Sequence, residues 1–216
     1  MNVGGESRLA KLAAQSRAPI GVNRSSTESV FEQCDLCSAI VPVEHQHLVD
    51  IAARRIVCAC RACATLFDNA AISGRQYRLI PDGVRRLIEP HGADAFWAEL
   101  AIPVDLAFFF FDSTAQRVVA LYPGPMGVAE CQLPLGAWET FASANDVLRM
   151  LQPDVEALLV NRTKEHRDYW LVPIDACYTL AGVMRSHWKG LGGGDDVWHE
   201  LDRFFDGLEA RAVKVS

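Results

Sequence analysis

The chain has 216 residues, half of them hydrophobic and 22% charged, with a formal net charge of −6 at pH 7. This is the composition of an ordinary globular protein with a sizeable core. The acidic balance argues against nucleic-acid binding, which needs a concentrated basic surface. No apolar run reaches the roughly 18 residues of a membrane-spanning helix, and the first residues lack the apolar core of a signal peptide. We therefore expect a cytoplasmic protein without a membrane span.

Residues 1–29 are rich in Ser, Gly, Arg and Asn. Such a segment has too few apolar side chains to offset the entropy lost on folding. A flexible tail is expected here, the alternative being a short helix over residues 6–15.

Residues 30–80 are predicted to form a metal-binding module, because they contain two Cys-x2-Cys pairs. The pairs are Cys34–Cys37 and Cys60–Cys63, separated by 22 residues. Each spacing wraps a tight turn that brings two thiolates to one ion, and two such turns complete a tetrahedron. Disulfides are not expected in the cytosol. A redox dithiol or inert thiols remain as alternatives to a bound metal.

The segment between the two pairs predicts a β-hairpin. HLV and RIVCAC read as strands around a polar turn near Asp50 to Arg54. Each Cys-x2-Cys turn is called a knuckle, and the order of knuckle, hairpin and knuckle is that of a zinc-ribbon or rubredoxin-like module. Zinc and iron both accept four thiolates. Rubredoxin knuckles usually carry Gly after the second cysteine, whereas Ser38 and Ala64 stand here, so the residues by themselves favour zinc.

Three further side chains are candidates for a second shell or for spare ligands. Cys58 precedes Cys60 by two residues, so both would share a face if they lay on one strand. The alternative for Cys58 is a small packed core residue. His45 and His47 also share a strand face, and they would either join the ligands or lie at the surface.

Residues 81–216 are predicted to form a separate α+β domain. A connector with a short helix at DAFWAEL (94–100) leads to a buried strand from Ile102 to Asp112 and its partner RVVALYP (117–123). The strand VAECQL (128–133) follows. SANDVLRMLQ (143–152) is read as a helix with Ser143 or Asn145 as its cap.

The last third of the chain contains a strand pair and two helices. EALLVN (156–161) and DYWLVP (168–173) read as strands joined by a charged turn. Asp175 is the expected cap of a helix that ends at Gly190, and Asp195 or Asp196 that of a second helix. Both helices carry an apolar stripe. Strand pairs followed by helices predict an α+β fold on an antiparallel sheet.

No arrangement of Ser, His and Asp, or of Cys and His, stands out as catalytic. Cys131 falls in a strand pattern and Cys177 on an apolar helical stripe, so both are read as core residues. No catalytic residues are assigned, and a metal-binding accessory protein is expected rather than an enzyme.

Two stretches carry a resemblance to a known family: CDLCSAIVPVEHQHLVDIAARRIVCACRACATLF and VPIDACYTLAGVMRSHWKGLGGGDDVWHELDRFF. They resemble a bacterial family of uncharacterised function whose members are encoded beside high-affinity uptake nickel–iron hydrogenases. The resemblance covers residues 31–210, and the family's cysteines correspond to Cys34, Cys37, Cys58, Cys60 and Cys63. It is also similar in logic to the rubredoxin-type accessory proteins of uptake-hydrogenase operons. With this genomic context, iron and zinc are equally expected as the bound ion.

The leading hypothesis is an accessory or maturation factor for nickel–iron hydrogenase that binds one zinc or iron ion through its four cysteines. It would act by protein–protein interaction, docking on hydrogenase subunits or on other maturation proteins, or would pass single electrons during iron–sulfur cluster assembly. The alternatives are a small redox enzyme that uses Cys58 beside the metal, and a permanent structural subunit of the hydrogenase complex.

Overall fold

The computed structural model describes residues 32–100, 102, 105–131, 133–134, 136–190 and 193–216. The tail predicted for residues 1–29 lies outside the described residues. Contacts within the chain group Phe31–Ser216 into one unit. The division predicted at residue 80 within this unit stays a prediction.

The segment with the two cysteine pairs contains short strands and two short helices. Its elements are β1 (Glu32–Gln33), β2 (Ile40–Val41), β3 (Gln46–Asp50), β4 (Arg55–Ala59), α2 (Arg61–Phe67), α3 (Ala70–Ser73) and β5 (Tyr77–Leu79). The first two strands pair with each other, and the other three form a sheet in the order β4-β3-β5. The predicted hairpin is confirmed, because β3 and β4 pair antiparallel from Gln46 opposite Ala59 to Asp50 opposite Arg55.

The rest of the described chain is built on a seven-stranded sheet with the order β12-β6-β11-β10-β7-β8-β9. Its strands are β6 (Arg85–Leu87), β7 (Leu106–Asp112), β8 (Arg117–Gly124), β9 (Gly127–Cys131), β10 (Glu156–Asn161), β11 (Asp168–Pro173) and β12 (Val213–Val215). All neighbours are antiparallel except β12 and β6, which run parallel. The predicted α+β class with an antiparallel sheet is confirmed.

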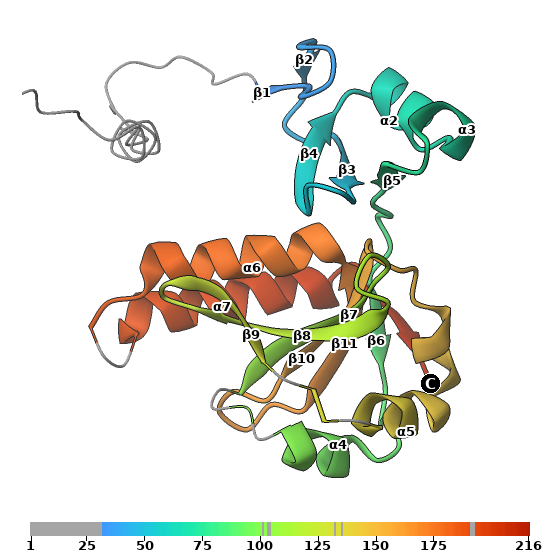
Figure 1. Ribbon diagram of the computed structural model, residues 1–216. Helices are drawn as coiled ribbons and strands as arrows, with labels where there is room; N and C mark the ends of the chain where they lie inside the picture. The colour runs from blue at the N-terminus through green and yellow to red at the C-terminus, as the bar shows by residue number, and fades with distance from the viewer. Residues whose placement is uncertain (1–31, 101, 103–104, 132, 135, 191–192) are drawn as a thin grey trace, which may run out of the picture. The chain divides into compact units, whose positions relative to one another are not determined.

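Helices cover both faces of this sheet (Figure 1). They are α4 (Ala93–Leu100), α5 (Ala137–Ser143), the 3₁₀ helix η1 (Asp146–Met150), α6 (Ile174–His187) and α7 (Gly194–Glu209). The two C-terminal helices pack on one face, and α4 with α5 packs on the other. None of the described helices combines the length and the apolar composition that a bilayer crossing requires.

The central strands are apolar without interruption because both of their faces are buried. Side chains alternate between the faces of a strand. Phe108 and Leu159 therefore pack on the side of α6 and α7, while Phe109 and Leu158 pack against α4 and α5. All four side chains are fully buried. Their burial on folding supplies the main stabilisation of the sheet.

The caps predicted for the two C-terminal helices are wrong, although the apolar stripes are confirmed. The residue at the N-cap of α6 is Pro173, so Asp175 lies inside the first turn. The N-cap of α7 is Gly193, with φ at +86° and no space for a Cβ, which would meet Val197 Cγ1 at 2.9 Å. A helix start in this conformation favours Gly over Asp.

Other boundaries also differ from the prediction. The predicted helix over 143–152 is the shorter η1, where Asn145 occupies the N-cap but turns its side chain to the backbone of His91 and Phe141. The strand expected from Ile102 begins at Leu106. The sequence reading also missed β6, β12 and α5, which are short.

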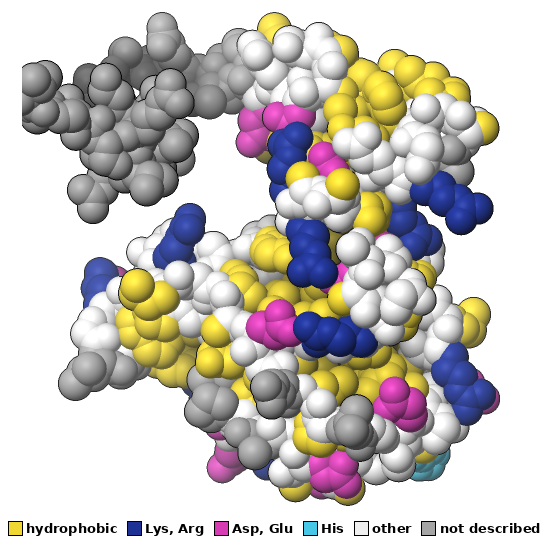
Figure 2. Space-filling view, viewed as in Figure 1, with side chains coloured by type: hydrophobic (Ala, Val, Ile, Leu, Met, Phe, Trp, Pro, Cys, Tyr) yellow, Lys and Arg dark blue, Asp and Glu magenta, His cyan; other side chains and the backbone are white. Residues whose placement is uncertain are grey.

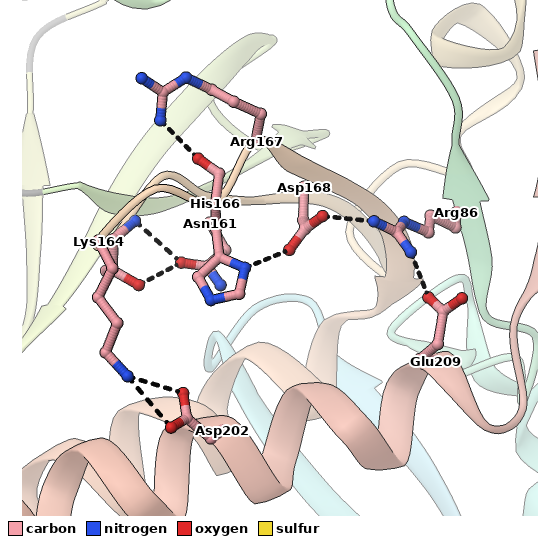
Figure 3. Close-up of polar contacts among 9 residues, drawn as sticks. Arg86, Asn161, Lys164, His166, Arg167, Asp168, Asp202 and Glu209 are labelled. Atoms are coloured by element: carbon pink, nitrogen blue, oxygen red, sulfur yellow. Dashed lines mark hydrogen bonds and ion pairs between the residues drawn. The ribbon is translucent and has the colours of Figure 1, made fainter.

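Ion pairs connect the helical layer to one edge of the sheet (Figure 3). Arg86 on β6 donates to Asp168 on β11 at 2.5 Å and to Glu209 on α7 at 2.7 Å. Lys164, in the turn between β10 and β11, lies 3.1 Å from Asp202 on α7. These contacts fix the position of α7 beyond what its apolar stripe specifies.

A buried ion pair offers a test of the sheet. Glu156 on β10 is 7% exposed and accepts from Arg85 at 2.7 Å and from the Gln152 backbone N–H at 2.9 Å. Glu156→Ala should lower the free energy of unfolding by about 3 kcal/mol, because it leaves the Arg85 charge without its partner. Urea unfolding measures this loss.

The matched control is the exposed pair of Arg117 and Glu130, whose side chains are 53% and 47% exposed. Glu130→Ala should cost less than about 1 kcal/mol, as is usual for a surface pair. Equal losses in the two variants would show that burial of Glu156 contributes nothing.

Candidate metal centre

Four cysteine sulfurs converge in the N-terminal part of the described chain. The Sγ atoms of Cys34, Cys37, Cys60 and Cys63 all lie within 4.8 Å of one another. The Cys37 and Cys60 sulfurs are 3.7 Å apart. Tetrahedral zinc with bonds of about 2.3 Å to sulfur separates its sulfurs by about 3.8 Å. The four cysteines therefore lie close enough to bind one metal ion.

The first pair lies in a tight turn between β1 and β2. The Cys34 N–H donates to the Ala39 carbonyl, and the Ser38 N–H donates to the Cys34 carbonyl, each at 2.8 Å. Ser38 has a φ of +60°, the left-handed conformation that glycine adopts most easily. The turn thus keeps the knuckle geometry at a cost of about 1 kcal/mol for a non-glycine residue.

The second pair leads directly into a helix, which the sequence reading did not predict. Cys60 is the N-cap of α2, and its sulfur accepts from the Cys63 N–H at 3.4 Å. Free N–H groups and the positive end of the helix dipole favour negative charge at this position. Ala64 follows Cys63 inside this helix, so the second knuckle needs no glycine at that position.

The clustered thiols oppose one another's ionisation. Burial raises the pKa of Cys34, but hydrogen bonds from the backbone of Cys60, Leu36 and Cys37 outweigh it and lower this pKa to about 6. Burial and the neighbouring thiols raise the pKa of Cys63 far above its ordinary value. One thiol ionises readily and another resists, as expected for coupled groups. A cation removes this conflict, since metal binding deprotonates all of its thiol ligands.

The four-cysteine cluster is buried on one side and open on the other. Cys34 and Cys63 are 1% and 8% exposed, whereas Cys37 lies at the surface. The apolar cluster around these sulfurs contains few residues, with Val41 as its fully buried aliphatic member. So small a cluster leaves the turn of the first cysteine pair dependent on its ligands for stability.

Cys58 lies with the histidines rather than with the four-cysteine set. Its Sγ and one ring nitrogen each of His45 and His47 form a second group in which all three atoms lie within 4.8 Å of one another. Among the described residues, these are the two groups of potential metal ligands whose ligand atoms all lie within 4.8 Å of one another. Cys60 lies one residue beyond the end of β4, and the shared face of Cys58 and Cys60 expected from sequence stays a prediction.

Asp175 is a residue of this region that sequence reasoning missed. Its Oδ2 lies 2.9 Å from Nδ1 of His47, across 128 residues of sequence. The hydrogen bond to this carboxylate raises the pKa of His47. Burial opposes the rise, and the negative charges of Asp175, Glu32 and Asp35 add to it. No local signal could have found the contact, since the sequence pattern marked Asp175 as a helix cap.

The two remaining cysteines are placed as predicted. Cys131 ends β9 and is half-buried, while Cys177 lies on the buried stripe of α6. Burial raises the pKa of both thiols. Neither belongs to a group of potential metal ligands among the described residues, so Cys131 is a suitable control for cysteine substitutions.

In a comparison with protein families, residues 33–212 match a family described as "Family of unknown function (DUF5947)". Neither the curated proteins nor the solved structures contain a match.

A substitution in the four-cysteine set should loosen this segment selectively. In the zinc-loaded protein, Cys34→Ser should speed amide hydrogen exchange in β3, β4 and α2 by at least about tenfold, because metal binding and local folding are coupled. Exchange in β10 and β11 should stay unchanged. Cys131→Ser is the control and should alter neither region. Identical exchange in Cys34→Ser and the unsubstituted protein would contradict this coupling.

Proposed function

The chain belongs to the family of unknown function DUF5947, and we propose that it is an accessory protein that holds one zinc or iron ion and docks on a partner protein. The observation that carries this proposal is the convergence of four thiols at spacings that suit a tetrahedral ion. The ligands would be Cys34, Cys37, Cys60 and Cys63. A closed set of four protein ligands is typical of a structural metal site.

Apolar side chains exposed near the cysteine pairs support docking. Leu66 on α2 and Ile72 on α3 are 46% and 54% exposed, and together with Arg61, Ala62 and Thr65 they line one shallow hollow. Figure 2 shows hydrophobic side chains gathered at the surface where α2 and α3 lie. Contiguous exposed apolar surface marks interaction sites, whereas single exposed apolar residues are ordinary.

The proposed partners are subunits of a nickel–iron hydrogenase or other proteins of its maturation. What supports this choice is the resemblance of residues 31–210 to proteins encoded beside uptake hydrogenases. The apolar hollow on α2 and α3 would provide the contact surface, and the metal would hold α2 in place.

A second candidate function is single-electron transfer during cluster assembly. The exposure of Cys37 favours it, because a sulfur at the surface gives a partner close access to the metal. This candidate requires iron, since zinc has no redox chemistry. Docking is compatible with either metal.

Metal analysis separates the two candidates. In protein purified without oxygen, Cys60→Ala should lower the metal content by one ion per chain relative to the unsubstituted chain, whereas Cys131→Ala should leave it unchanged. A coloured iron centre that bleaches reversibly on reduction supports electron transfer, and colourless zinc excludes it and leaves docking. Full metal content in Cys60→Ala would overturn the assigned ligand set.

Substitutions that place a negative charge on the proposed docking surface test its role. Leu66→Asp and Ile72→Asp should each reduce co-purification with hydrogenase subunits by at least about tenfold, because a charge in an apolar interface is costly. Met126→Asp, at a 97% exposed residue between β8 and β9, is the control and should bind as the unsubstituted chain does. Unchanged binding in the first two variants would exclude this surface.

A further inference from the structure

His45, His47 and Cys58 meet on one face of the β3–β4 hairpin. His47 lies directly opposite Cys58 in the antiparallel register, so their side chains project to the same side. His45 lies one residue before β3, and one of its ring nitrogens comes within 4.8 Å of the ligand atoms of both His47 and Cys58. The imidazole rings of His45 and His47 have centroids 4.7 Å apart. The hairpin itself therefore sets the convergence of these three side chains.

Hydrogen bonds orient both imidazoles in the same way. Nδ1 of His45 lies 2.9 Å from the Pro42 carbonyl oxygen, and Nδ1 of His47 lies 2.9 Å from the Asp175 carboxylate. A carbonyl oxygen and a carboxylate can only accept, so each Nδ1 carries the proton and donates it. In the neutral form of each ring, Nε2 then carries a lone pair that can bind a metal ion. Metal-binding histidines usually make this hydrogen bond from their second nitrogen.

His45 provides an independent observation that a ligand is missing. Its side chain is 5% exposed, and its Nε2 is buried without a hydrogen-bond partner among the described residues. A buried acceptor without a partner costs about 1–3 kcal/mol. The cost is removed when the lone pair binds a metal ion.

We propose that His45 Nε2, His47 Nε2 and Cys58 Sγ bind a second divalent transition-metal ion, of which zinc is the representative. Imidazole and thiolate are the ligands that zinc prefers. Three protein ligands leave the fourth position of a tetrahedron open for water or a small ligand. Catalytic zinc sites share this arrangement, whereas structural sites are closed. The second site stands on its own residues and does not depend on the ion held by the four cysteines.

Asp175 has a positioning role in this site, because it holds the ring of His47 from the first turn of α6. Asp175→Asn should therefore weaken binding of the second ion by about 10–100-fold, the usual effect of losing an outer partner of a metal-bound histidine. Binding of the first ion should not change. A merely structural role for Asp175 would not separate the two affinities in this way.

The experiment is a titration of zinc into the full metal-free chain under reducing conditions, with bound zinc counted after gel filtration. The unsubstituted chain should bind one ion more than Cys58→Ser, His45→Ala or His47→Ala. Cys131→Ser and His166→Gln are matched controls and should bind as many ions as the unsubstituted chain. Circular dichroism confirms that each variant is folded.

Cobalt identifies which ion is lost. Charge-transfer absorption from thiolate to cobalt should fall slightly in Cys58→Ser, which removes one thiolate, and strongly in Cys60→Ser, which disrupts the four-thiolate set. An ion that persists in Cys60→Ser but disappears in Cys58→Ser supports the second site even if the four cysteines hold nothing. Equal numbers of bound ions in Cys58→Ser and the unsubstituted chain would overturn the proposal.

Discussion

Four thiol sulfurs held within 4.8 Å of one another impose the main constraint on the N-terminal part of the described chain. Thiolates at such distances repel one another. The local fold nonetheless keeps them together, with Ser38 in a left-handed conformation and Cys60 at a helix start. The apolar cluster beneath them is too small to stabilise this arrangement by burial alone. A bound cation would resolve both problems at once, because it would neutralise the thiolates and hold the two turns together.

The sheet with two buried faces is the rigid body to which this metal-binding segment is attached. Besides apolar contacts of Val49 and Ile80 with the core, the attachment uses charge pairs. Arg54 lies 2.6 Å from Asp112, whose side chain is 7% exposed, and Arg78 lies 3.4 Å from the equally buried Asp154. Buried carboxylates at or near the ends of the interior strands β7 and β10 need such partners. These contacts hold the β3–β4 hairpin against the seven-stranded sheet, and His47 lies within hydrogen-bond distance of Asp175 on α6 as a result.

The two proposed metal sites are connected through the backbone. The Cys58 N–H donates to the Asp35 carboxylate at 2.6 Å, and the Asp35 N–H donates to the Cys58 carbonyl at 2.9 Å. Asp35 lies in the turn of the first cysteine pair, so this turn and the strand with Cys58 move together. An ion in the closed four-cysteine site would therefore limit the motion of the strand that carries Cys58, although the open site uses none of the four cysteines. In this arrangement the first metal supports the structure and the second offers a reactive position.

The sequence by itself determined the features that depend on local spacing. Two Cys-x2-Cys turns predict a tetrahedral site where they meet. Uninterrupted apolar segments predict the central strands, and apolar residues spaced by three and four positions predict the helices α6 and α7. Only the tertiary structure decided which polar side chain meets which. Asp175 was expected to cap a helix but instead binds His47, and Cys58 joins two histidines rather than the nearby cysteines. β6 and β12 escaped prediction because strands of three residues are stabilised by distant neighbours and carry almost no pattern of their own. Contacts across a hundred residues arise from packing, and no local propensity encodes them.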